Sequence, residues 1–280
     1  MSMTKAHEAN KRKAVIYGAA IGDALGVPYE FLKRDTFKCT DMVGYGSHNK
    51  PAGTFSDDTS MLLATLASID ECGAVDPDDM RERYCDWYYN GAYTADGVVF
   101  GTGRTTAVSL KLGHGLDDER SNGNGSLMRI APLAFIEASD EEVRAASAVT
   151  HAHQISTESC VIFVRILRAA MNGESLEGAI KANSDHDKPF EFLKTLACTP
   201  RDEVGSSGFV LDALQASLWC ALHTNTFKDC VLEAVNLGED TDTTACVAGA
   251  LAGAMYGFDA IPTEWINELR GKLVIKSYLF

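Results

Sequence analysis

Two carboxylates stand directly before a long run of small, apolar residues. Gly238 and Glu239 lead into Asp240 and Asp242, with threonines between and after the acids. The run that follows is too long for a strand and rich in alanine, so we expect a buried helix over 241–256. Exposed N–H groups and the macrodipole favour negative charge at a helix N-terminus. Burying these carboxylates beside an apolar helix is still costly unless something neutralises them, and a hard divalent cation is the obvious candidate.

A second acidic cluster has the same chemistry and the same position on a helix. Ser56, Asp57, Asp58 and Thr59 open an apolar run that predicts a helix over 57–72. One such cluster alone is more often a helix cap than a metal site. Two matching clusters reverse that preference, because they can supply opposite sides of one site. Carboxylate and hydroxyl oxygens are the ligands that hard cations take.

The composition fits a globular protein with one domain over residues 1–280. The hydrophobic share is 46%, and no Pro/Ser-rich linker, low-complexity segment or fixed-period repeat divides the chain. No run approaches the roughly 18 to 20 apolar residues of a membrane span, and residues 1–13 lack a signal-peptide core. We expect a soluble, cytoplasmic protein, and a monomer because no exposed heptad seam is visible.

Charge and cysteine usage exclude several classes of site. The formal net charge of −14 argues against a nucleic-acid surface, which would need a basic patch. The eight cysteines are scattered and none forms C-x-x-C, so we predict neither a zinc site nor a disulfide framework.

Helical patterns cover well over half of the chain and strand patterns almost none, which predicts an all-α fold. Residues 272–280 have a strand-like composition without a partner and stay unassigned. The further helices that we expect lie at 11–26, 76–89, 127–136, 139–150, 154–171, 175–183, 189–197, 208–222, 227–237 and 262–270.

Glu30 and two histidines are ambiguous from local sequence alone. Glu30 lies between two aromatic residues, which favours a residue on the rim of a site over a buried functional carboxylate. His151 and His153 do not share a helix face, so a zinc pair is improbable and a solvated or capping role is the alternative.

Two glycine-rich loops could bind an anionic ligand. Gly101, Thr102 and Gly103 precede a helix, and their N–H groups could cradle phosphate oxygens. This loop is neither a P-loop nor a full dinucleotide fingerprint. In the second loop, over 121–126, polar side chains alternate with glycines, which fits either a ligand loop or a plain surface turn.

Five motifs occur in order between residues 12 and 270. They are Gly22-Asp23-Ala24-Leu25-Gly26-Val27-Pro28-x-Glu30-Phe31, Gly53-x-Phe55-Ser56-Asp57-Asp58-Thr59, Asn122-Gly123-Asn124-Gly125-Ser126-Leu127-Met128-Arg129, Thr150-His151-Ala152-His153 and Gly238-x-Asp240-Thr241-Asp242-Thr243. Together they resemble the ADP-ribosylglycohydrolase family. That family includes the dinitrogenase reductase-activating glycohydrolase and the vertebrate ADP-ribosyl-acceptor hydrolases.

The resemblance implies a compact all-α domain, an orthogonal helical bundle with two divalent cations, Mg²⁺ or Mn²⁺. Glu30 falls on the family's catalytic or water-positioning glutamate, which reverses the local preference for a rim residue; Asp58 and Asp240 would also take part in catalysis. By family match the metal ligands would be Ser56, Asp57, Asp58, Asp240, Asp242 and Thr243. The residues that fall where the family holds the diphosphate and the riboses are Gly101, Thr102, Gly103, Ser121, Asn122, Asn124, Gly125, Ser126 and His151.

The implied activity is hydrolysis of the N- or O-glycosidic bond at ribose C1″ of a mono-ADP-ribosylated protein or small molecule, with ADP-ribose as the product. Two alternatives are another binuclear-metal hydrolase acting on a nucleotide-like substrate and a non-catalytic ADP-ribose-binding protein. Glu30 and the six ligand positions argue against a pure binder.

One position departs from the family pattern. In members acting on ADP-ribosyl-arginine, the resemblance implies an Asp directly before the -x-Gly-x-Thr-Thr run, where this chain has Gly101. Arg104 adds positive charge nearby, and the alternative acid, Asp96, lies five residues away on a loop. Arginine, serine, other O-linked and small-molecule acceptors therefore all stay open.

Overall fold

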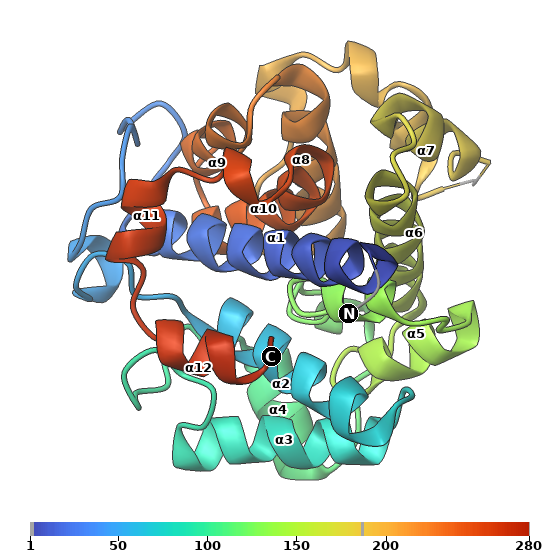
Figure 1. The fold of residues 1–280 in the computed structure, drawn as a ribbon. Coiled ribbons are helices and arrows are strands. Elements are labelled where there is room, and N and C mark those ends of the chain that lie inside the picture. Colours follow the sequence, from blue (N-terminus) through green and yellow to red (C-terminus); the bar gives the residue numbers. More distant parts are fainter. Residues whose placement is uncertain (1–2, 186–187, 280) are drawn as a thin grey trace.

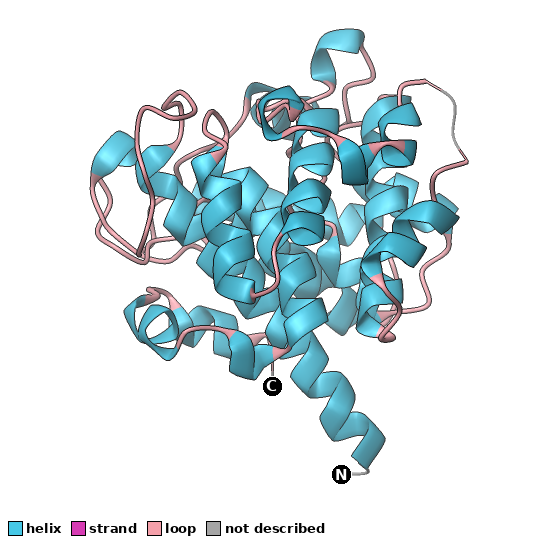
Figure 2. Ribbon diagram, turned by 90° about the horizontal axis from the view of Figure 1, so that it is seen from above, coloured by secondary structure: helices cyan, strands magenta, loops and turns pink. Residues whose placement is uncertain are grey.

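The computed structural model describes residues 3–185 and 188–279, which form helices and no sheet (Figure 2). The all-α prediction is confirmed. The α-helices are α1 (Met3–Gly26), α2 (Asp57–Cys72), α3 (Pro77–Asn90), α4 (Arg104–Leu112), α5 (Asp140–Ala148), α6 (Gln154–Met171), α7 (Leu176–Ala182), α8 (Val210–His223), α9 (Phe227–Asn236), α10 (Thr241–Tyr256), α11 (Thr263–Glu268) and α12 (Lys272–Ser277).

The helices are arranged around α1, which runs across the middle of the molecule in Figure 1. On one side it packs against α10, which α8 and α9 cover in turn; on the other side lie α2, α3 and α4. The small apolar residues of α10 are buried on all sides of the helix from Thr241 to Gly253. A helix that is apolar all round has to be buried in this way.

Glycines let α1 and α10 touch backbone to backbone. A Cβ atom added to Gly18 would lie 2.2 Å from the carbonyl oxygen of Gly249, and one added to Gly22 would lie 1.9 Å from the carbonyl oxygen of Ala245. Neither distance is compatible with a side chain. The contact therefore depends on the absence of side chains along one face of each helix.

Local capping sets several helix ends where the sequence predicts them. Ser56 caps α2 by accepting a hydrogen bond from the N–H of Asp58, and Gly73 ends that helix in the left-handed region with φ 68°. Asp76 caps α3, with Pro77 in its first turn. The capping box of Ser139 with the third residue of α5 is also present.

Three terminal or proline-flanked segments differ from the prediction. The predicted helix at 127–136 is a turn followed by a 3₁₀ helix at Ala131–Phe135, because Pro132 cannot donate the N–H that a helix interior needs. The predicted helix at 189–197 is a pair of short 3₁₀ turns that bury Leu193 and Leu196, an i, i+3 spacing that suits the 3₁₀ repeat. The unassigned tail forms α12 instead of a strand.

Two further observations concern the chain as a whole. None of the described helices combines the length and the apolar character needed to cross a lipid bilayer. All eight cysteines are free thiols, five of them buried.

The backbone contact of α1 with α10 gives a direct test. We expect Gly249→Val to lower the free energy of unfolding by about 3 kcal/mol, because the new side chain has to displace the backbone of Gly18. Gly103→Ala is the control, since a Cβ added there meets no atom within 4 Å, and its effect should stay within about 0.5 kcal/mol. Urea denaturation of both variants measures the difference, and equal stabilities would contradict the packing described.

Candidate active site

The N-termini of α2 and α10 meet at a cavity of about 380 Å³. Each helix begins in one of the two acidic clusters, so residues that are almost two hundred positions apart in the sequence share one wall. Glu30 follows the 3₁₀ turn Val27–Tyr29 after α1 and lines the same cavity. The acids and the hydroxyl residue of this wall are Glu30, Asp57, Asp58, Asp240, Asp242 and Thr243.

Burial makes this carboxylate group unfavourable as a set of anions. It raises the pKa values of Asp57, Asp58 and Asp242 well above the usual aspartate range, and the neighbouring carboxylates raise them further. All three residues are buried: Asp57 is 6% exposed, and Asp58 and Asp242 are each 2% exposed. A bound cation would remove the repulsion.

The donor set fits a hard divalent cation. Ser56 Oγ donates to Asp58 Oδ2 at 2.9 Å, whereas Asp58 Oδ1 is buried without any hydrogen-bond partner among the described residues. An orphaned carboxylate oxygen of this kind is rare in a folded protein and calls for an ion or water. Asp23, Asp58 and Asp242 can each present one oxygen such that all three lie within 4.8 Å of one another. These buried acids could therefore hold a metal.

Asp23 is a buried acid to which the sequence analysis assigned no role. Its carboxylate accepts hydrogen bonds from the N–H of Ser56 at 2.9 Å and from the N–H and hydroxyl of Thr59 at 3.0 and 2.6 Å. It thus satisfies N-terminal donors of α2 from the neighbouring helix α1. Burial raises its pKa to about 6, although these hydrogen bonds oppose the shift. Its position in the Gly22-Asp23 motif is its one sequence signal, since neither a cap nor an acidic cluster marks it.

Glu30 is buried, with 8% exposure, and is therefore not a rim residue. The next residue, Phe31, has a φ of 69° and donates its N–H to the carbonyl of Glu239 at 2.7 Å. Glu239 has a φ of 62° and returns a bond from its own N–H to Leu32 at 2.8 Å. The loop that carries Glu30 is thereby tied to the loop that opens α10.

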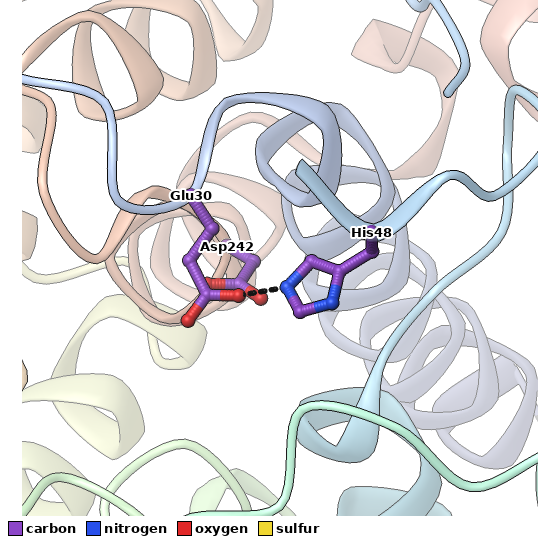
Figure 3. Close-up of side chains that lie close together, drawn as sticks. All are labelled: Glu30, His48 and Asp242. Atoms are coloured by element: carbon purple, nitrogen blue, oxygen red, sulfur yellow. Dashed lines mark hydrogen bonds and ion pairs between the residues drawn. The ribbon is translucent and has the colours of Figure 1, made fainter. Parts of the chain in front are cut away.

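His48, a residue for which the sequence predicted no role, lies against Glu30. Its Nε2 is in hydrogen-bond contact with Glu30 Oε2, and Asp242 lies beside the pair (Figure 3). This histidine is almost two hundred residues before the start of α10 in the sequence but belongs to the same site.

A second part of the cavity wall is rich in glycine. It includes Gly101, Thr102 and Gly103 at the start of α4, and Asn124 and Gly125 of the second loop. Asn124 Nδ2 donates to Asp240 Oδ2 at 2.9 Å, which joins this wall to the acidic one. Arg104 and Arg120, which the sequence analysis did not place in the site, also line the cavity and add positive charge there.

His151 presents a neutral ring to this wall. Burial, and secondly the charge of Arg129, lower its pKa to about 3. Thr150 Oγ1 accepts a hydrogen bond from Arg129 at 2.9 Å and lies 2.8 Å from His151 Nδ1. If the threonine hydroxyl donates to Nδ1, the ring proton lies on Nε2, which is then able to donate to a ligand beside Gly125.

Four of the expected site residues lie behind the cavity wall. Ser56 bonds Asp58, and Ser126 is fully buried and bonded to Ser147. Asn122 accepts from Ser156 at 3.0 Å, and Ser121 donates to Asp118 at 2.7 Å. Their hydroxyl and amide groups hold the loops in place.

Gly101 leaves no room for a carboxylate at its position. Its φ is +83°, and an added Cβ would lie 2.3 Å from Asp57 Oδ1. Asp96, the other acid considered, is paired with Lys50 at 3.2 Å. The absence of a carboxylate at position 101 therefore follows from the packing of the site.

The raised pKa values predict how pH affects the cation-free protein. A carboxyl group whose pKa is higher in the folded than in the unfolded state favours folding when protonated. The contribution of Asp23 is complete below its unfolded pKa and is lost as pH rises through about 6. With chelator present, the melting temperature should therefore be higher at pH 5 than at pH 7.5. A saturating divalent cation should abolish that difference, and a cation-independent pH profile in calorimetry would contradict the electrostatics described.

Comparison with known proteins agrees with this geometry. The family model described as ADP-ribosylglycohydrolase matches residues 4–279. The chain is 35% identical to an ADP-ribosylarginine hydrolase Tri1 of Serratia proteamaculans, over 93% of this chain and 75% of that protein. It is 30% identical to the ADP-ribosyl-[dinitrogen reductase] glycohydrolase of Rhodospirillum rubrum, over 91% of this chain and 89% of that protein.

A solved structure has the same fold. The chain of an ADP-ribosylglycohydrolase-related protein complex superimposes with a TM-score of 0.82 at 30% identity, covering 98% of this chain and 97% of that one. The matches of sequence and fold lead to one conclusion: this chain belongs to the ADP-ribosylglycohydrolase family.

Proposed function

We propose that this protein is a hydrolase that cleaves the glycosidic bond between ribose C1″ of an ADP-ribosyl group and an arginine side chain of a protein. The observation that carries the proposal is the convergence of five carboxylates, from Glu30 and the starts of α2 and α10, on one cavity. Membership of the family supports the reaction. The printed activity of the relative from Serratia proteamaculans supports the acceptor.

Two divalent cations, Mg²⁺ or Mn²⁺, would belong to this site. Their ligands would be Asp57, Asp58, Asp240, Asp242 and Thr243, which line the cavity, together with Ser56, whose hydroxyl bonds Asp58 behind the wall. The all-oxygen donor set and the orphaned Asp58 Oδ1 support this assignment. When bound, such cations orient ribose hydroxyls and lower the pKa of water.

The residues of the chain then have separate roles in the hydrolysis. Glu30 is placed to take a proton from the attacking water or to give one to the leaving group. Asp58 and Asp240 line the cavity, where positive charge develops at C1″ in an oxocarbenium-like transition state.

The glycine-rich wall would hold the rest of the substrate. Backbone N–H groups at 101–103 and at Gly125, the Nε2–H of His151 and the two arginines can bind diphosphate and ribose oxygens. We assign Ser121, Asn122 and Ser126 to loop support instead of direct contact, because their polar groups bond within the protein.

The acceptor would meet an aromatic face in place of a carboxylate. Phe31 lines the cavity and is 69% exposed. A guanidinium group can stack on such a face. This ring offers arginine a binding surface that Gly101 cannot provide.

We also propose a single domain over residues 1–280 that acts as a monomer in the cytoplasm, with no nucleic-acid surface. Support comes from the unbroken family match over residues 4–279, the eight free thiols and the net charge of −14.

Removal of Asp58 tests the cation site. Asp58→Ala should lose bound cation and reduce ADP-ribose release about 1000-fold, because several kcal/mol of transition-state stabilisation depend on the cations. Glu71→Ala is the matched control, since it removes an exposed acid from the far end of the same helix. Cation content from elemental analysis and release assayed by chromatography are the readouts. Full activity of Asp58→Ala without bound metal would overturn the assignment.

Substrate comparison tests the acceptor. ADP-ribosyl-arginine and ADP-ribosyl-serine peptides are assayed in parallel with Mg²⁺ or Mn²⁺ and with a chelator. We expect cation-dependent ADP-ribose release at least about 10-fold faster from arginine, the discrimination that about 1.4 kcal/mol provides. Faster release from serine would reject arginine but keep the glycohydrolase. Binding of ADP-ribose without release from either would favour a non-catalytic binder, and release of AMP a different hydrolase.

A further inference from the structure

A strained turn lies against the segment that carries Glu30. Tyr45, Gly46 and Asn49 all have positive φ values, of 74°, 45° and 51°. The turn is closed by a bond from the N–H of Tyr45 to the carbonyl of Lys50. Non-glycine residues hold such conformations only where the surrounding structure requires them, and these positions cluster at functional sites. The strain in this turn therefore points to a functional role.

Three contacts of the turn fall on the residues around Glu30. Gly46 packs so closely that an added Cβ would lie 2.0 Å from the carbonyl oxygen of Pro28. Ser47 Oγ donates to the carbonyl of Glu30 at 2.6 Å. His48 Nε2 meets the Glu30 carboxylate at Oε2 (Figure 3). One turn thus holds both the main chain and the side chain of the glutamate.

The imidazole of His48 is itself held in place by rings. Its centroid lies 5.8 Å from that of Phe31 and 5.2 Å from that of Phe100. The side chains of His48 and Glu30 are only 16% and 10% exposed. A ring fixed on both sides can fix the carboxylate that it contacts.

We infer that His48 is a positioning residue that holds the Glu30 carboxylate in the orientation needed for proton transfer. Nε2–H donates to Oε2, and Oε1, which has no other hydrogen bond among the described residues, is left for the water or the leaving group. A glutamate side chain otherwise samples several rotamers, and misplacing a proton-transfer group by 1 Å is costly to rate. This inference rests on the proposed function and adds a residue to its machinery.

A second role has to be separated from the first. Glu30, His48 and Asp242 can also present ligand atoms within 4.8 Å of one another, so His48 could instead be a cation ligand. Loss of His48 would then lower cation content, whereas a positioning residue leaves it unchanged.

Two variants distinguish these roles. His48→Phe keeps a ring between Phe31 and Phe100 but removes the hydrogen bond, whereas His48→Gln keeps a donor close to the position of Nε2. We expect His48→Phe to lower kcat about 10- to 100-fold, as loss of an orienting partner typically does. KM, cation content and melting temperature should stay unchanged. His48→Gln should recover most of kcat, and in a Glu30→Gln background His48→Phe should have no further effect.

The outcomes separate cleanly. A wild-type kcat for His48→Phe would overturn the inference and leave the proposed function standing. A fall in cation content would assign His48 to the metal site instead. Equal losses in His48→Phe and His48→Gln, or a full further loss in the Glu30→Gln background, would exclude action through Glu30. Absence of ADP-ribose release by the wild-type protein would overturn the proposed function and this inference with it.

Discussion

The backbone of α1 lies directly against the backbone of α10, and the position of each acid in the site depends on that contact. It continues to the last residue of α1, where a Cβ added to Gly26 would lie 2.3 Å from Cα of Asp242. Glu30 follows only four residues later, so it arrives beside the start of α10. Any side chain between the two helices would separate Glu30 from Asp242. Small residues along α1 and α10 therefore serve the chemistry as well as the core.

Without a bound cation, this site lowers the stability of the folded protein. Helix N-termini and the hydrogen bonds to Asp23 offset part of the charge, yet burial and mutual repulsion still raise the pKa values of Asp57, Asp58 and Asp242. Strained backbone at Phe31 and Tyr45 adds to the cost. Such concentrated strain and charge is typical of a functional site, and it explains why a cation would stabilise this fold.

The helix bounds that the sequence predicts correctly are those marked by a local signal. Helices α2, α6 and α10 begin and end where predicted, because a cap or an apolar run marks each of them. The two acidic clusters are visible for the same reason. Asp23 and His48 carry no such signal: the first lies inside a helix and the second in a polar loop, and only tertiary contacts bring them to the site.

The orientation of loop side chains also depends on tertiary contacts that the sequence does not reveal. The alternation of polar residues with glycine over 121–126 identifies a ligand loop or a turn, but it cannot tell which side chains face inward. In the structure Asn124 reaches Asp240, whereas Asn122 and Ser126 turn into the protein. Gly101 is a further example, since the reason for its lack of a side chain is the carboxylate of Asp57, far away in the sequence.

In the proposed reaction, water attacks ribose C1″ in the cavity between α2 and α10. Hydrolysis of an ADP-ribosyl-arginine peptide in H₂¹⁸O, followed at short times by mass spectrometry, tests it directly. Unlabelled ADP-ribose incubated in parallel corrects for exchange at C1″. Attack at C1″ gives ADP-ribose carrying one ¹⁸O atom and an arginine peptide carrying none. AMP together with a phosphoribosyl peptide would contradict it, because water would then have attacked phosphorus.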